Sequence, residues 1–104
     1  MPNNFEKTVN EIVNDTLNEI FTETATRLIY QHLEMNYQLK PEEVAQNIDT
    51  FKEGLEKFLS TGALAVEGVI TKRLYRQFKL KYENKQGWTF IDYMKNLKQQ
   101  AKSP

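Results

Sequence analysis

Apolar side chains recur at helical spacing along most of the chain, and the clearest series lies between Gly62 and Phe78. Its members follow at intervals of three and then four positions, as Ala63, Val66, Ile70, Leu74 and Phe78. At about 100° per residue, this spacing keeps them on one stripe of an α-helix. Lys72, Arg76 and Lys79 project to the opposite side. We therefore expect a central helix with one face in the core and the other toward water or an acidic partner.

The first third of the chain predicts a long helix, from about Asn4 to Met35. Asn3 and Glu6 have the spacing of a capping box at its start. β-Branched residues lose rotamer freedom in helices, so a break is left open at Thr22, Thr24 and Thr26. Unbroken, such a helix would span about 48 Å, which is more than one small core covers. We would then expect it to recruit a second copy of the chain.

Helix-ending and helix-starting residues divide the middle of the chain. Asn36 is suited to end the first helix because asparagine tolerates positive φ. Pro41 suits the first position of a new helical turn, with acidic residues following it. A further amphipathic helix covers residues 48–59 and contains Gly54, which predicts a close helix crossing. Thr61 and Gly62 then separate this helix from the central one.

The last third predicts a loop and a short final helix. Residues 79–87 are polar and turn-rich, and Thr89 with Asp92 resembles a capping box. Apolar residues at 90, 91, 94 and 97 form the face of the final helix, with Trp88 placed to pack over it. The predicted fold is all-α: one domain over residues 1–104, a single compact bundle of four to five helices with a long N-terminal helix. We expect about residues 1–4 and 99–104 to be frayed.

Composition is that of one folded domain of 104 residues, with 39% hydrophobic and 27% charged residues. No apolar run approaches the roughly eighteen residues that a membrane span requires. The first ten residues have neither the basic nor the apolar region of a signal peptide. With no cysteine in the chain, disulfides and thiolate metal sites are excluded. We expect a cytoplasmic protein without membrane association.

Charge is divided between the two halves of the chain. From Met1 to Glu56 eleven acidic residues face four basic ones, and from Lys57 to Pro104 three acidic residues face ten basic ones. The halves therefore carry −7 and +7. Acidic helices packing on basic helices, within a monomer or across a dimer, is the interpretation we favour. The alternative is that the basic half contacts a polyanion.

Residues suited to catalysis are scarce. His32 is the only histidine and lies among apolar neighbours, which is typical of a packed or interfacial side chain. Ser60 and Ser103 are the only serines, and the chain has no cysteine, so few nucleophiles are present for catalysis with a histidine base. No Glu-x-x-His pair is present for a helical di-metal site, and the glycines are too scattered for a phosphate loop. We expect no enzyme activity, no catalytic residue, no metal and no cofactor.

Binding is the remaining class of function, and it has three candidate surfaces. A homodimer contact is predicted on the first helix, at Val9, Val13, Leu17, Ile20 and Leu28. A nucleic-acid contact is the alternative, on the basic side of the central helix, at Lys72, Arg73, Arg76 and Lys79. A small-molecule site between helices near Tyr30 and Trp88 is a third option. The preferred prediction is a non-enzymatic interaction module that acts through homodimerisation and protein partners.

Several segments resemble a family of small all-helical archaeal domains, the Nitrosopumilus-type output domains. The similar segments run from about Leu28 to Leu97 and comprise residues 41–45, 51–59, 62–63, 69–70, 74–75 and 90–93. This resemblance implies a signal-transduction output or interaction domain. It carries over no site residues, and the first twenty or so residues lie outside it.

Overall fold

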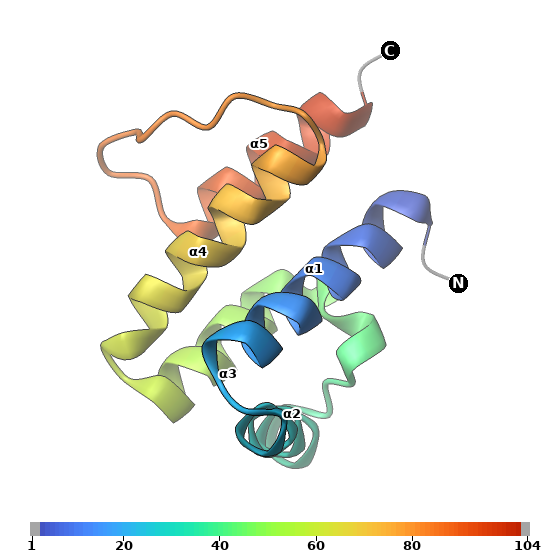
Figure 1. Cartoon of the computed structure of the whole chain (residues 1–104), viewed down its shortest axis with the longest axis vertical. Helices are drawn as coiled ribbons and strands as arrows, with labels where there is room; N and C mark the ends of the chain where they lie inside the picture. The colour runs from blue at the N-terminus through green and yellow to red at the C-terminus, as the bar shows by residue number, and fades with distance from the viewer. Residues whose placement is uncertain (1–2, 103–104) are drawn as a thin grey trace.

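Helix α4 (Gly62–Gln77) packs against three other helices: α1 (Asn4–Ile20), α3 (Ile48–Leu59) and α5 (Phe90–Lys102). Helix α2 (Glu23–Tyr37) packs on α1 and α3, and the short 3₁₀ turns η1 (Pro41–Glu43) and η2 (Ala45–Asn47) join α2 to α3. The computed structural model describes residues 3–102 (Figure 1), and this part of the chain contains five α-helices and no β-strand. The prediction of an all-α bundle is confirmed.

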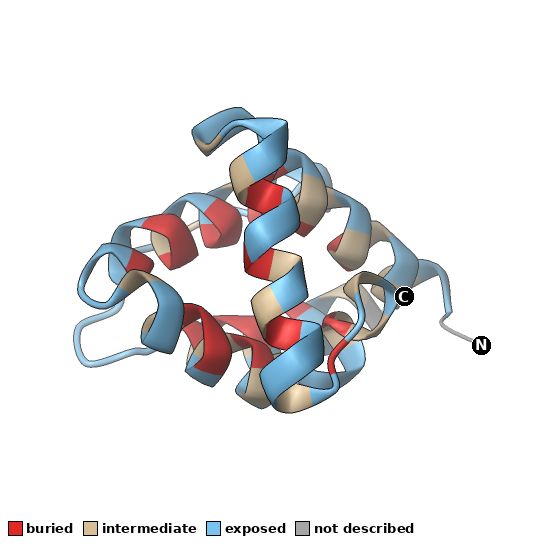
Figure 2. Cartoon of the chain, turned by 90° about the horizontal axis from the view of Figure 1, so that it is seen from below, coloured by how far each residue is buried: buried red, intermediate tan, exposed pale blue. Residues whose placement is uncertain are grey.

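The predicted apolar stripe of α4 forms the middle of the core. Ala63, Val66, Ile70 and Leu74 are buried, and Phe78, just past the end of the helix, is half-buried against Phe5. Figure 2 shows buried residues on the inward faces of the helices and exposed residues on the outward faces. Burial of apolar area of this kind is the main favourable term in folding.

The predicted long N-terminal helix is two helices. Helix α1 ends at Ile20, and the extended backbone of Phe21 and Thr22 lets α2 turn away from it. The Thr22 hydroxyl then accepts a hydrogen bond from the Ala25 amide at 3.1 Å. A threonine that weakens a helix interior is a good N-cap because its oxygen satisfies a free amide of the first turn. The continuous helix that motivated a second copy is therefore absent.

This break changes the fate of the predicted dimer contact. Val9, Val13 and Leu17 are fully buried in the core of the same chain. The prediction that these three side chains meet a second copy is wrong, because α2 folds back and α4 covers them. Ile20 and Leu28, from the same predicted contact, are exposed at 41% and 50%.

Side-chain hydrogen bonds fix the connection between α2 and α3. Helix α2 ends at Tyr37 with Gln38 in the left-handed region at φ 55°, two residues later than the predicted Asn36. Pro41 begins η1, as its fixed φ predicts. The Asn10 side chain of α1 donates to the Glu42 carbonyl and accepts from the Ala45 amide, both at 2.8 Å. One amide side chain thus ties both 3₁₀ turns to α1.

Gly54 marks a close crossing of α2 and α3, as predicted. A Cβ at this position would overlap Leu33 Cδ2 and lie 3.1 Å from the Tyr37 ring. The His32 ring, from the same face of α2, lies 3.1 Å from the Gly54 carbonyl oxygen through Nε2. The missing side chain is what lets the two helices approach this closely.

The 78–89 connection loops out beside α4 before α5 returns along it (Figure 1). Residues 80–89 form no helix or strand, in agreement with the predicted loop. Thr89 and Asp92 form the predicted cap, with Thr89 N donating to Asp92 Oδ2 at 2.8 Å. Helix α5 continues to Lys102 and α1 begins at Asn4, so residues 4 and 99–102, which were predicted to be frayed, have helical backbone. The predicted frayed residues 1–2 and 103–104 lie outside the described part of the chain.

Candidate ligand-binding site

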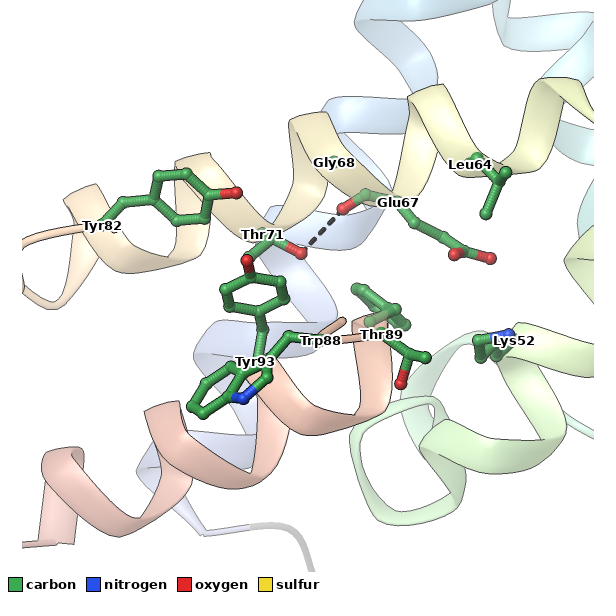
Figure 3. Close-up of a pocket in the computed structure, with 10 residues that line it drawn as sticks. Lys52, Leu64, Glu67, Gly68, Thr71, Tyr82, Trp88, Thr89 and Tyr93 are labelled. Atoms are coloured by element: carbon green, nitrogen blue, oxygen red, sulfur yellow. Dashed lines mark hydrogen bonds between the residues drawn. The ribbon is translucent and has the colours of Figure 1, made fainter. Parts of the chain in front are cut away.

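A cavity of about 240 Å³ lies where α3, α4 and α5 meet the 80–89 segment. Four elements contribute to its lining, which consists of Lys52, Leu64, Glu67, Gly68, Thr71, Tyr82, Trp88, Thr89, Phe90 and Tyr93. In Figure 3 the aromatic rings of Tyr82, Trp88 and Tyr93 gather at one end, and Glu67 and Lys52 lie toward the other. The cavity therefore combines an aromatic end with a charged end.

Glu67 is the most unusual side chain of this lining. It is only 4% exposed, because it begins a second series on α4, Glu67, Thr71 and Tyr75, that is buried beside the apolar stripe. Thr71 satisfies its own hydroxyl by donating to the Glu67 main-chain carbonyl at 2.8 Å. The Glu67 carboxyl oxygen Oε2 is buried and has no hydrogen-bond partner among the described residues. Buried carboxyl groups are normally paired, since an unpaired one is costly.

The surroundings of Glu67 favour its protonated form. Burial raises the pKa of the Glu67 carboxyl from 4.5 to about 7, and hydrogen bonding and repulsion from the Glu56 carboxylate act in the same direction. Lys52 opposes this shift, but its ammonium is held by Glu56 at 2.7 Å. That bond raises the pKa of Lys52 and lowers the pKa of Glu56. Lys52 and Glu56 therefore neutralise each other, and Glu67 forms no ion pair within residues 3–102.

The aromatic end of the cavity is a connected set of rings. The Tyr93 ring lies 5.4 Å from Tyr82 and 5.1 Å from Trp88, centroid to centroid. Lys72 lies over the Tyr82 ring at 5.7 Å and Lys85 over the Trp88 ring at 5.2 Å. Such positions are typical of cation–π contacts. Faces of both rings thus already attract positive charge from the chain itself.

Hydrogen bonds hold the irregular 80–89 segment in place. Its first residue, Leu80, donates from its amide to the Tyr75 carbonyl at 2.9 Å. Farther along, the Lys85 amide donates to the Tyr93 hydroxyl at 2.8 Å. The capping bond between Thr89 and Asp92 fixes its last residue. These bonds position Tyr82 and Trp88 at the cavity without regular secondary structure.

His32 has a structural environment, in agreement with its interpretation from the sequence. Its Nε2 faces the Gly54 carbonyl, and its Nδ1 lies 3.1 Å from the Asn36 side-chain nitrogen. The tautomer with hydrogen on Nε2 satisfies both contacts. The ring also packs on Phe58 at 5.1 Å, well away from the residues that line the cavity.

Three of the four predicted polyanion residues lie together, and the fourth, Lys72, lies apart from them. Arg73, Arg76 and Lys79 line an open groove between α1 and α4, together with Ile12, Glu19 and Gln77. Arg73 is paired there with Glu19 at 2.6 Å, an ion pair that joins the acidic half to the basic half as the favoured interpretation of charge predicts. Lys72 lies instead over Tyr82. Of the residues predicted for a small-molecule site, Trp88 lines the cavity and Tyr30 does not.

The sequence interpretation missed Glu67 because a lone glutamate on a helix is normally assigned to the surface. A usable pattern is present: Glu67, Thr71 and Tyr75 follow at i, i+4 and i+8, directly beside Val66 and Ile70. This widens the buried arc of α4 beyond the apolar stripe. Glu56, the other carboxyl group near Glu67, is half-buried and bonded to Lys52.

Two further properties bear on the kind of site. No group of three or more His, Asp or Glu residues with the arrangement of a metal site occurs within residues 3–102. Within the same residues, every helix is too short or too polar to cross a bilayer.

Comparison with protein-family models, curated proteins and solved structures gives no match for this chain. The geometry of the cavity therefore carries the functional proposal.

Proposed function

We propose that this chain is a non-enzymatic binding module and that the cavity beside Glu67 is its binding site. The main support is that the buried Glu67 Oε2 accepts no hydrogen bond from the residues that the structure describes, and that Glu67 lines a cavity. A buried acceptor without a partner costs about 1–3 kcal/mol, so a donor that enters the cavity gains what the free chain lacks. The rest of the lining, largely aromatic and aliphatic, is typical of small binding sites.

The size of the cavity limits what enters it. Pockets for drug-sized ligands measure roughly 300–1,000 Å³, and this one holds about 240 Å³. We infer a small molecule or a single side chain of a protein partner as the occupant. The lining amine, Lys52, is engaged by Glu56, which supports binding rather than covalent chemistry at this site.

A fragment screen by two-dimensional NMR tests this proposal. Fragments that bind should shift the backbone amides of residues 64–71 and the indole N–H of Trp88. In Gly68→Leu these shifts should disappear, because a side chain at 68 projects into open space within the cavity lining. Ala65→Leu places the same leucine side chain on the exposed side of α4 and should leave them unchanged. Fragments that bind only elsewhere, or equally well to Gly68→Leu, would contradict the proposal.

Self-association through α2 is a second proposal, supported by a specific feature. Leu28 and Met35 are 50% and 75% exposed and lie seven residues apart, which places them on one side of the helix. Sedimentation equilibrium at tens of micromolar is the test. A dimer that Leu28→Lys dissociates would support this contact, and a monomer of 12.3 kDa would exclude it.

Signal output and nucleic-acid binding stay predictions from the sequence. The first depends on the archaeal resemblance alone. The second is less favoured because Arg73 is paired with Glu19, and its test is a salt-dependent mobility shift.

A further inference from the structure

We propose that the Glu67 cavity selects a guanidinium group, either of a small free compound or of an arginine side chain of a partner protein. This inference rests on the proposed function, since it names the chemistry of the occupant of the same cavity. The lining of this cavity has a carboxyl group at one end and aromatic rings at the other, and each end restricts the chemistry of the occupant.

The carboxyl end requires a hydrogen-bond donor. Glu67 Oε2 is buried and accepts no hydrogen bond from any residue between 3 and 102, so an occupant that brings N–H groups satisfies it. Guanidinium presents parallel N–H groups that match the two oxygens of a carboxylate. A quaternary ammonium has no N–H to give, and a carboxylate or phosphate would place negative charge beside Glu67. The Glu67 carboxyl group therefore disfavours both quaternary ammonium compounds and anions as occupants.

Charge balance favours a cation over a neutral donor. Glu56 and Glu67 share a single ammonium, that of Lys52, which is bonded to Glu56. An entering guanidinium brings a second positive charge and favours loss of the proton from Glu67, and in a partly desolvated site the resulting charge-assisted hydrogen bonds are about twice as strong as neutral ones. A neutral isostere such as a urea offers the same N–H geometry without this gain.

The aromatic end favours a flat cation. Guanidinium stacks on aromatic faces, and it gives up its hydration more readily than an ammonium does. Tyr82, Trp88 and Tyr93 provide these faces within one cavity. Lys72 and Lys85 already lie over two of the rings, and Lys85 is balanced by Glu83 at 3.9 Å. A volume of about 240 Å³ is suited to a single side chain or a small molecule.

Trp88 offers a direct test, since it is the only tryptophan in the chain and lines the cavity. Its fluorescence would be followed on titration with methylguanidinium, N-methylurea or tetramethylammonium at constant ionic strength. Methylguanidinium should give a saturable change, and the other two should bind about tenfold or more weakly, as expected when a charged hydrogen bond is lost. Capped Gly-Arg-Gly and Gly-Lys-Gly peptides separate the sources. Tighter binding of the arginine peptide than of methylguanidinium indicates a partner side chain.

Three variants distinguish the possible failures. Glu67→Gln keeps the shape and should weaken methylguanidinium about tenfold or more, while Gly68→Leu should abolish binding and Ala65→Leu should not. Equal binding of N-methylurea and methylguanidinium would overturn the guanidinium inference and leave the proposed function standing. If the fragment screen also finds nothing that Gly68→Leu excludes, both are wrong. Should Glu67→Gln unfold, the three probes on the unmodified chain still decide the ligand class.

Discussion

The hydroxyl of Tyr75 on α4 lies 2.7 Å from Asn96 Oδ1 on α5 and 3.2 Å from the Tyr93 carbonyl oxygen. Because Tyr75 is buried, this contact joins the two helices that carry Glu67 and Tyr93 to the cavity. The hydroxyl of Tyr30 is the opposite case. It is buried with no hydrogen-bond partner in the described part of the chain.

These two tyrosines make a matched pair of substitutions. Tyr75→Phe should lower the free energy of unfolding by about 1–2 kcal/mol, since it removes a buried hydrogen bond and leaves an acceptor behind. Tyr30→Phe should be neutral or stabilising, because it removes only a desolvated hydroxyl. Urea denaturation of both variants measures the difference. Equal losses in the two variants would show that the hydroxyl contacts do not determine the effect.

Gly54 and Gly68, which both lie inside helices, should respond oppositely to alanine. Gly54→Ala forces Leu33 and the Tyr37 ring to move in a packed crossing, and we expect a loss of about 1–3 kcal/mol. At Gly68 nothing lies within 4 Å of the added Cβ, so Gly68→Ala should gain up to about 1 kcal/mol through helix propensity. Thermal unfolding by circular dichroism gives both values. A stabilised Gly54→Ala variant would contradict the close crossing.

Asn10 should matter more than its half-buried position on α1 indicates. Asn10→Asp replaces the donor to the Glu42 carbonyl with a charged oxygen and should cost about 1–3 kcal/mol. Asn14, one turn later, forms no side-chain hydrogen bond with the residues that the structure describes, and Asn14→Asp should stay within about 0.5 kcal/mol. The measurement is urea denaturation. Guanidinium chloride is avoided because guanidinium is the proposed ligand of the cavity and would stabilise the folded chain.

Glu67 should make the chain less stable as pH rises from about 4.5 to 7. The folded chain keeps a proton on Glu67 up to a pKa of about 7, whereas the unfolded chain releases it near 4.5. In this interval the native state binds more protons, so the free energy of unfolding falls with increasing pH. The charged groups around it are Glu56 and Lys52 of α3.

Glu67→Gln isolates this effect. Glutamine resembles the protonated acid, so the variant should match the unmodified chain near pH 5 and exceed it in stability near pH 8. Glu19 and Glu56 have lowered pKa values, and their contributions are lost only below their ordinary range, outside this window. Urea denaturation at several pH values is the measurement. Parallel pH profiles for the two proteins would show that Glu67 does not titrate in this interval.

Features of local structure could be predicted from the sequence because they depend on residues close together along the chain. Side-chain spacing set the stripe of α4, the conformation of proline set the start of η1, and Gly54 marked the helix crossing. The capping bond of Thr89 and Asp92 follows from the same local rules. The cap, the proline turn and the helical spacing have nearly the same energy whatever the rest of the chain does, whereas Gly54 indicated a crossing without identifying its partner helix.

Tertiary structure decided where α1 ends and how far the buried face of α4 extends beyond the predicted apolar stripe. Thr22 was compatible with a continuous helix or with a cap, and the gain from folding α2 back onto α3 favours the cap. Glu67 was compatible with the surface until α3, α5 and the 80–89 segment enclosed it. Both outcomes depend on contacts between residues far apart in sequence, and helical spacing alone contains no information about which elements meet.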